Sequence, residues 1–323
     1  MQWLKERPSV LREGCKNAYI PQSVILIILI FLAVFGISQL AVSIIPTIIV
    51  LPETVFYLLG ADIDLTDSQA VSDYVMGYHM SDAALIAQLY ATTIGTMLAI
   101  VFCLDIEKRS FSSMGFVKKR ACTDYLLGAV IGVAMLGGAV GFGVLTGAMS
   151  YESMGLNGKT GLLLVLLGGW LLQGMSEEVI FRGYFCNTLA ARTNRHVAAV
   201  ISSVGFMLAH FGNPGITPLA CLNLFLFGMF AAYFMFRFDS LWGIGALHSL
   251  WNFSQGNLFG VQVSGLDTSV SVFRFSVDAD KALLNGGSFG LEGGLGVTIV
   301  FLIGIALLLF VPVRKTAESE ITA

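Results

Sequence analysis

Long apolar segments alternate with short polar ones along almost the whole of this chain. A helix needs about 20 apolar residues to cross the hydrocarbon core of a bilayer, so each long segment predicts one membrane-spanning helix. The fifth segment is short for such a span and the fourth is long. The predicted helices cover residues 22–49, 83–104, 125–148, 161–191, 197–211, 217–236, 241–259 and 294–313.

Composition and charge agree with this pattern. Hydrophobic residues fill 56% of the 323 positions and charged residues 12%, whereas soluble domains carry about 25% charged residues. Lys and Arg accumulate in cytoplasmic loops. With the N-terminus inside, 14 of the 18 Lys and Arg residues fall in inner segments, three in outer segments, and Arg182 within a helix. The sequence predicts an all-α, polytopic integral membrane protein with about eight transmembrane helices and cytoplasmic N- and C-termini.

Five regions follow from this layout. The cysteines lie in inner loops or in helices, so no disulfide framework is expected. The loop before the last helix is Gly-rich and has alternating apolar residues, which favour an outer loop with a short hairpin. A lid over a cavity is the alternative for this loop. The regions are a cytoplasmic segment (1–21), the first three transmembrane helices (22–160), a core that carries the polar motifs (161–260), the outer loop (261–293), and the last helix with a cytoplasmic tail (294–323).

The stretch GMSEEVIFRG places Glu177, Glu178 and Arg182 inside the long fourth apolar segment. A charged side chain at the bilayer centre costs about 2.5–3.5 kcal/mol, and such residues usually face the protein interior and serve a function. Glu178 and Arg182 are four residues apart with the acid first, the favourable order for a helical ion pair. Glu177 points elsewhere and has no such local partner, so it is the candidate general base. The alternative, a solvated inner loop, is disfavoured because Arg192 and Arg195 mark a better boundary.

Two histidines and an asparagine lie in later apolar segments. His210 ends the fifth segment, and His248 and Asn252 share one face of the seventh. At 1.5 Å per residue, Glu177, His210 and Asn252 are about 20–22 Å from the inner helix ends and His248 about 14 Å. These depths predict one polar layer inside the membrane. A packing or hydrogen-bonding role is the alternative for either histidine alone.

These motifs resemble those of a known family. The stretch EEVIFR is similar to an EExxxR motif, FMLAH (206–210) to FxxxH, and HSLWN (248–252) to HxxxN/D. In this order, on successive apolar segments, they resemble the CAAX-protease and bacteriocin-processing (CPBP or Abi) family of intramembrane endopeptidases, related to the type II CAAX prenyl endopeptidase. The SFSSMGF stretch also resembles a feature of bacterial members.

The resemblance implies an endopeptidase acting on a membrane-associated peptide or protein. It implies that Glu177 and His210 activate a water, while His248 and Asn252 donate hydrogen bonds to the oxyanion; Glu178 and Arg182 form a structural ion pair. A Zn²⁺ held by Glu177, His210 and His248 would make a metalloprotease, because two histidines and a glutamate are a known catalytic zinc set. The chain has no HExxH helix, and we favour a mechanism without a metal or another cofactor.

Two other functions stay open. A non-catalytic scaffold or bacteriocin-immunity protein could keep this fold, but the complete set of motif residues favours catalysis. A transporter could use buried charges as a relay, but the sequence shows no inverted repeat of the kind that supports one. We expect a multi-pass protein of a bacterial plasma membrane, whose partners are the lipid bilayer and a peptide or protein substrate, with no nucleic acid.

Overall fold

The computed structural model describes residues 15, 17–60, 66–76, 80–156 and 158–311. Most of the predicted cytoplasmic N-terminal segment and the whole of the tail after residue 311 lie outside these ranges. The described part is mostly helical, with 75% helix and little sheet. An all-α, multi-pass membrane architecture therefore fits the chain.

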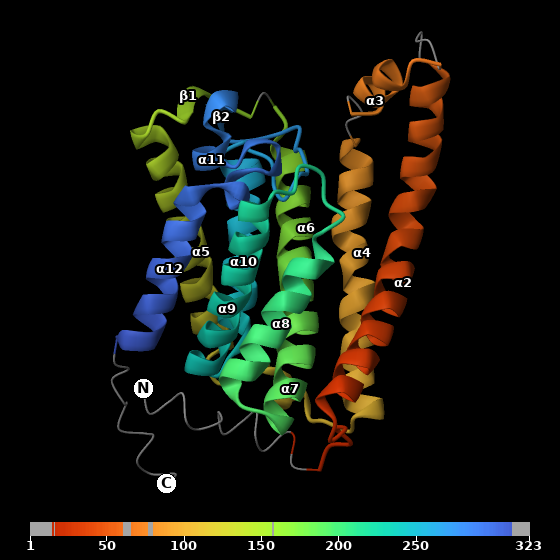
Figure 1. Cartoon of the computed structure of the whole chain (residues 1–323), viewed down its shortest axis with the longest axis vertical. Helices are drawn as coiled ribbons and strands as arrows, with labels where there is room; N and C mark the ends of the chain where they lie inside the picture. The colour runs from red at the N-terminus through yellow and green to blue at the C-terminus, as the bar shows by residue number, and fades with distance from the viewer. Residues whose placement is uncertain (1–14, 16, 61–65, 77–79, 157, 312–323) are drawn as a thin grey trace.

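Each predicted apolar segment forms a helix (Figure 1). Three of these helices continue into π-helical turns, η2 (Phe102–Ile106) after α4, η4 (Val179–Cys186) after α6 and η5 (Ser254–Leu258) after α10. The helices are α2 (Val24–Leu59), α4 (Asp82–Val101), α5 (Ala121–Leu145), α6 (Thr160–Glu178) with η4 and α7 (Asn187–Arg192), α8 (Arg195–Ala209), α9 (Pro218–Phe238), α10 (Leu241–Phe253) and α12 (Leu295–Phe310).

Five helical stretches within the described residues are long and apolar enough to cross a membrane. Two more apolar helices, α8 and α12, are shorter than a full span. The count of eight spans and the cytoplasmic termini therefore stay predictions. The five long stretches are Val24–Leu59, Asp82–Ile106, Ala121–Leu145, Thr160–Arg192 and Pro218–Phe238.

The first helix extends well past its predicted end at residue 49. It continues through Pro46 and Pro52 to Leu59, a length of 36 residues, or about 54 Å at 1.5 Å per residue. Its C-terminal part is fastened to the start of the next long helix, because Ser81 Oγ donates a 2.6 Å hydrogen bond to Glu53. Figure 1 shows the result, with α2 and the short α3 (Ser68–Met76) reaching beyond the other helices at one end.

The central helix α10 packs closely against α5 and α6. A Cβ atom on Gly128 of α5 would lie 1.9 Å from the Gly243 carbonyl oxygen, and one on Gly132 would lie 2.4 Å from that of Leu247. On the other side, a Cβ on Gly174 of α6 would lie 2.6 Å from the backbone nitrogen of Ser249. Small residues at membrane helix contacts let backbones approach in this way. These contacts fix the position of α10 between its two neighbours.

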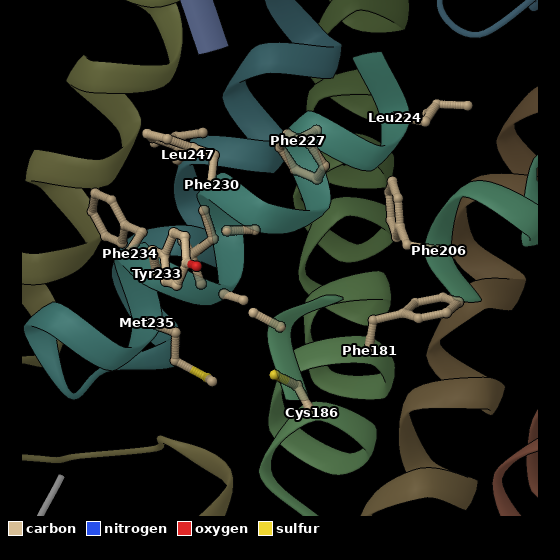
Figure 2. Close-up of a cluster of buried hydrophobic side chains, with 14 of the residues drawn as sticks. Phe181, Cys186, Phe206, Leu224, Phe227, Phe230, Tyr233, Phe234, Met235 and Leu247 are labelled. Atoms are coloured by element: carbon tan, nitrogen blue, oxygen red, sulfur yellow. The ribbon is translucent and has the colours of Figure 1, made fainter. Parts of the chain in front are cut away.

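Aromatic side chains fill the space between α6, α8 and α9 (Figure 2). The rings of Phe181 and Phe206 meet edge to face at 5.2 Å, and those of Phe206 and Phe227 lie 5.3 Å apart. Edge-to-face pairs are a favourable ring geometry. All three rings are buried, so this cluster holds η4, α8 and α9 at fixed spacing.

The prediction of a local hairpin within residues 261–293 is wrong. Strand β2 (Phe273–Val277) instead pairs antiparallel with β1 (Met149–Met154), which follows α5. The pair has an irregularity between Tyr151 and Ser153. Alternating apolar residues signal a strand but do not identify its partner, so the pairing could not be derived from the pattern. The loop is thereby tied to the C-terminal end of α5.

Candidate active site

Glu177 lies in the last turn of α6, just before the π-helical segment η4. Its Oε1 accepts a 2.5 Å hydrogen bond from Nε2 of Gln173, four residues earlier. The expectation that Glu177 has no local partner is therefore wrong. Gln173 is a polar residue at helical spacing within an apolar segment, and that signal could have identified it. The other oxygen, Oε2, has no hydrogen-bond partner among the described residues.

Glu178 is completely buried and forms the predicted ion pair with Arg182, at 3.1 Å. The guanidinium of Arg182 also lies over the Phe206 ring, 4.4 Å from its centroid. The same Glu178 Oε1 lies 2.8 Å from Nδ1 of His248 on α10. A carboxylate accepts, so Nδ1 of His248 carries a proton. Glu178 therefore orients His248 as well as pairing with Arg182, a contact that the sequence did not predict.

His210 follows the last residue of α8. Its Nδ1 lies 2.8 Å from the carbonyl oxygen of Phe206. Because a carbonyl only accepts, Nδ1 must donate, and the neutral ring then has its lone pair on Nε2. That Nε2 faces Glu177 Oε2 at 3.9 Å, and Nε2 of His248 lies 3.8 Å from the same oxygen. The structure thus brings both histidines to one carboxylate oxygen.

Asn252 joins the group through Gln173. Its Nδ2 donates a 2.8 Å hydrogen bond to Gln173 Oε1, while Gln173 Nε2 donates to Glu177. The asparagine side chain is nearly fully buried, and one of its two N–H groups stays available. All four predicted catalytic side chains therefore meet in one place.

They line a cavity of about 320 Å³. Its walls come from α2, α4, α6 with η4, α8, α9, α10 and α12, and residues of the 261–293 loop also contribute. Besides the four predicted residues, the polar lining is formed by Gln39, Gln88, Thr92, Gln173, Ser176, Asn213, Asn223, Ser264 and Glu292. The cavity combines an apolar wall with few charged groups, as sites for small molecules and peptides usually do.

Glu177, His210 and His248 have the right ligand types for zinc, but their spacing does not match a shared ion. Ligands of a tetrahedral zinc at about 2.0–2.1 Å lie about 3.3 Å apart, which is closer than the 3.8 Å and 3.9 Å separations here. Within the described ranges, no group of three or more His, Cys, Asp or Glu side chains could hold a metal ion. As arranged, these residues do not fit a zinc ion.

Comparison with known families agrees with the motifs. Residues 159–254 match the family model described as type II CAAX prenyl endopeptidase Rce1-like. This segment contains Glu177, Glu178, Arg182, His210, His248 and Asn252, so the resemblance to this protease family is confirmed over that part of the chain. No curated protein is significantly similar to the chain. At the level of the family, the match supports a membrane-embedded peptidase.

Proposed function

We propose that this chain is an intramembrane endopeptidase of the CPBP type, which hydrolyses a peptide bond in a membrane-associated peptide or protein. The observation that carries the proposal is the meeting of Glu177 Oε2 with two imidazole nitrogens, at 3.8 Å and 3.9 Å, inside a cavity walled by apolar helices. We place the catalytic core in residues 161–260 and the protein in the plasma membrane of a bacterium.

Water activation is assigned to Glu177 and His210. A gap of 3.9 Å between Oε2 and Nε2 allows one water molecule to hydrogen-bond to both atoms at about 2.8 Å. Glu177 takes a proton from this water as its oxygen attacks the scissile carbonyl carbon. The carboxylate keeps its orientation during this step because Gln173 holds its other oxygen.

Stabilisation of the oxyanion is assigned to His248 and Asn252. Nδ1–H of His248 is already donated to Glu178, so donation from Nε2 requires the doubly protonated imidazolium. The Glu178 and Glu177 carboxylates flank this ring, at 2.8 Å from Nδ1 and 3.8 Å from Nε2. Asn252 donates its second N–H to the same oxygen. Preorganised donors in a site shielded from bulk water stabilise developing charge strongly.

The test uses purified protein in nanodiscs and a library of membrane-delivered peptides, with products identified by mass spectrometry. Glu177→Ala and His210→Ala should each lower cleavage by at least about 10²-fold, and Asn252→Ala by about 10²–10³-fold. Glu152→Ala, on the exposed strand β1, is the control and should cleave like wild type. Each protein is assayed with and without a zinc chelator, and activity should persist. Wild-type protein that cleaves no peptide would contradict the peptidase proposal, and loss of cleavage with chelator would contradict the metal-free mechanism.

A further inference from the structure

The outer loop supplies a carboxyl group to the cavity that no sequence motif indicates. Glu292 lies in a short 3₁₀ turn, η8 (Leu291–Gly293), directly before α12. It lines the same cavity as Glu177, His210 and His248, together with Ser264 from the start of the loop. The cavity therefore contains two carboxyl groups, one from α6 and one from the loop.

Several hydrogen bonds fix Glu292 in place. Ser264 Oγ donates to its Oε2, and Asn223 Nδ2 on α9 donates a 2.8 Å bond to its backbone oxygen. Asn213, three residues after His210, donates a 3.1 Å bond to the backbone oxygen of Ser264. These bonds connect the carboxyl to the turn that carries His210.

The backbone conformation at Ser264 is unusual. Ser264 has φ +48°, a left-handed conformation that is uncommon for residues other than glycine. Such conformations persist where the surrounding structure over-determines them, and they cluster at functional sites. The next residue, Gly265, has φ +87°, and a Cβ there would lie 2.3 Å from the Pro214 carbonyl oxygen. The loop is thus pressed against the segment that follows His210.

The surroundings of Glu292 favour its protonated form. Burial raises the pKa of this carboxyl above its usual value, and the Ser264 hydrogen bond and the electrostatic interactions with the two histidines only partly offset that effect. Within the part of the chain that the structure describes, no Lys or Arg forms an ion pair with it. The other titratable groups lining the cavity are Glu177 and the two histidines. A protonated carboxyl here is a proton donor in the same cavity as the reacting groups.

We propose that Glu292 is a further catalytic residue, the general acid that protonates the leaving amine of the peptide bond. This inference rests on the proposed peptidase function. Glu177 is less suited to the task because Gln173 holds its Oε1 at 2.5 Å, which limits its turning from the water to the nitrogen. Two carboxyl groups in different environments can divide base and acid roles in this way.

In the proposed cleavage, one proton passes to Glu177 and another leaves Glu292. One O–H bond of water breaks and its proton goes to Glu177, while the water oxygen forms a bond to the carbonyl carbon. The C–N bond then breaks as the carboxyl proton of Glu292 passes to the nitrogen, which leaves as an amine. The proton on Glu177 returns to Glu292 through water in the cavity, so both groups recover their starting forms.

The test compares a peptide substrate with a thioester of the same sequence. A thiolate leaves without protonation because thiol pKa values are about 8.5, whereas an amine does not. Glu292→Gln should lower kcat for the peptide by about 10²-fold with little change in KM, and cleave the thioester like wild type. Equal loss with both substrates, or no loss with either, would overturn the proposal. The control Glu152→Gln makes the same chemical change on an exposed strand and should alter neither rate.

The pH profile gives a second readout. Loss of the Glu292 proton as pH rises should produce an alkaline limb in kcat for the wild type, and this limb should be absent in Glu292→Gln. Ser264→Ala removes a bond that lowers the pKa of Glu292, so its limb should move to higher pH. The Ser264→Ala shift tests the proposal even if Glu292→Gln does not fold. An alkaline limb at the same pH in Ser264→Ala and in the wild type would overturn the proposal. Wild-type cleavage that Glu177→Ala abolishes shows separately that the peptidase function holds.

Discussion

At the scale of single residues, Gln173 connects the two sides of the candidate site. It donates to Glu177 on its own helix and accepts from Asn252 on α10. One amide therefore sets the orientation of the proposed base and of one proposed oxyanion donor. A side chain with both a donor and an acceptor is required for this arrangement, which a carboxylate or an apolar residue could not provide.

Gln173→Met tests this connection because it conserves volume and removes both hydrogen bonds. A hydrogen bond to a charged group contributes about 1.5–3 kcal/mol, so the peptidase rate should fall about 10–100-fold. Cleavage kinetics measure the effect, and thermal unfolding checks that the protein is folded. A folded Gln173→Met protein with the wild-type rate would show that Glu177 needs no such support.

Glu178 has two partners, and a double substitution separates them. Glu178→Gln leaves the buried Arg182 unpaired, which should lower the free energy of unfolding by about 3–5 kcal/mol. Adding Arg182→Gln should recover part of that stability, because no unpaired charge is left. Activity should stay low in the double variant, since His248 has lost its carboxylate partner. Recovery of both stability and cleavage would mean that Glu178 acts only on Arg182.

At the scale of helices, the contact between α5 and α10 determines where His248 lies. Two glycines of α5 leave room for the α10 backbone at this contact. Gly128 faces Gly243, and Gly132 faces Leu247, the residue before His248. The π-helical segment η4 follows Glu178 directly on the other side of the site. π-helical turns occur often at functional sites, and this one carries Arg182 to its ion pair.

Gly132→Ala should disturb this contact. The added methyl group would lie 2.4 Å from the Leu247 carbonyl oxygen, and overpacking of this kind costs about 1–3 kcal/mol. The midpoint of thermal unfolding should fall, and cleavage should fall with it because His248 is displaced. Gly137→Ala is the matched control on the same helix, since a Cβ there meets nothing within 4 Å. Equal melting temperatures for the two variants would contradict the proposed close packing.

At the scale of the whole molecule, the hydrophobic pattern predicted where the helices lie, because most apolar segments are long and each is bounded by polar residues. The pattern failed at the end of α2, where the predicted segment stops at residue 49 but the helix continues to Leu59. The Glu178–Arg182 pair was predictable because it is local in sequence. The Glu178–His248 contact joins residues 70 positions apart, and Glu292 belongs to no motif. Contacts of that kind depend on tertiary packing and cannot be derived from spacing.

The predicted orientation can be tested with cysteine labelling of intact cells. Cys122 is the exposed cysteine among those that the structure describes, and it lies at the predicted inner end of α5. Asp280→Cys places a thiol in the predicted outer loop, in a Cys122→Ser background. In intact cells, a membrane-impermeant maleimide should label position 280 of this variant. In the wild type, the same reagent should leave Cys122 unlabelled until the membrane is opened. The reverse labelling pattern would contradict cytoplasmic termini.

The most direct test of the whole account is the cleavage rate of Glu177→Gln in nanodiscs, measured on a peptide that the wild type cleaves. This change removes the negative charge and the basicity of residue 177 and alters its size very little. If Glu177 is the base, the variant should fold and its rate should be lower by at least about 10²-fold. A folded Glu177→Gln protein that cleaves at the wild-type rate would contradict the assignment of Glu177 as the base that activates water.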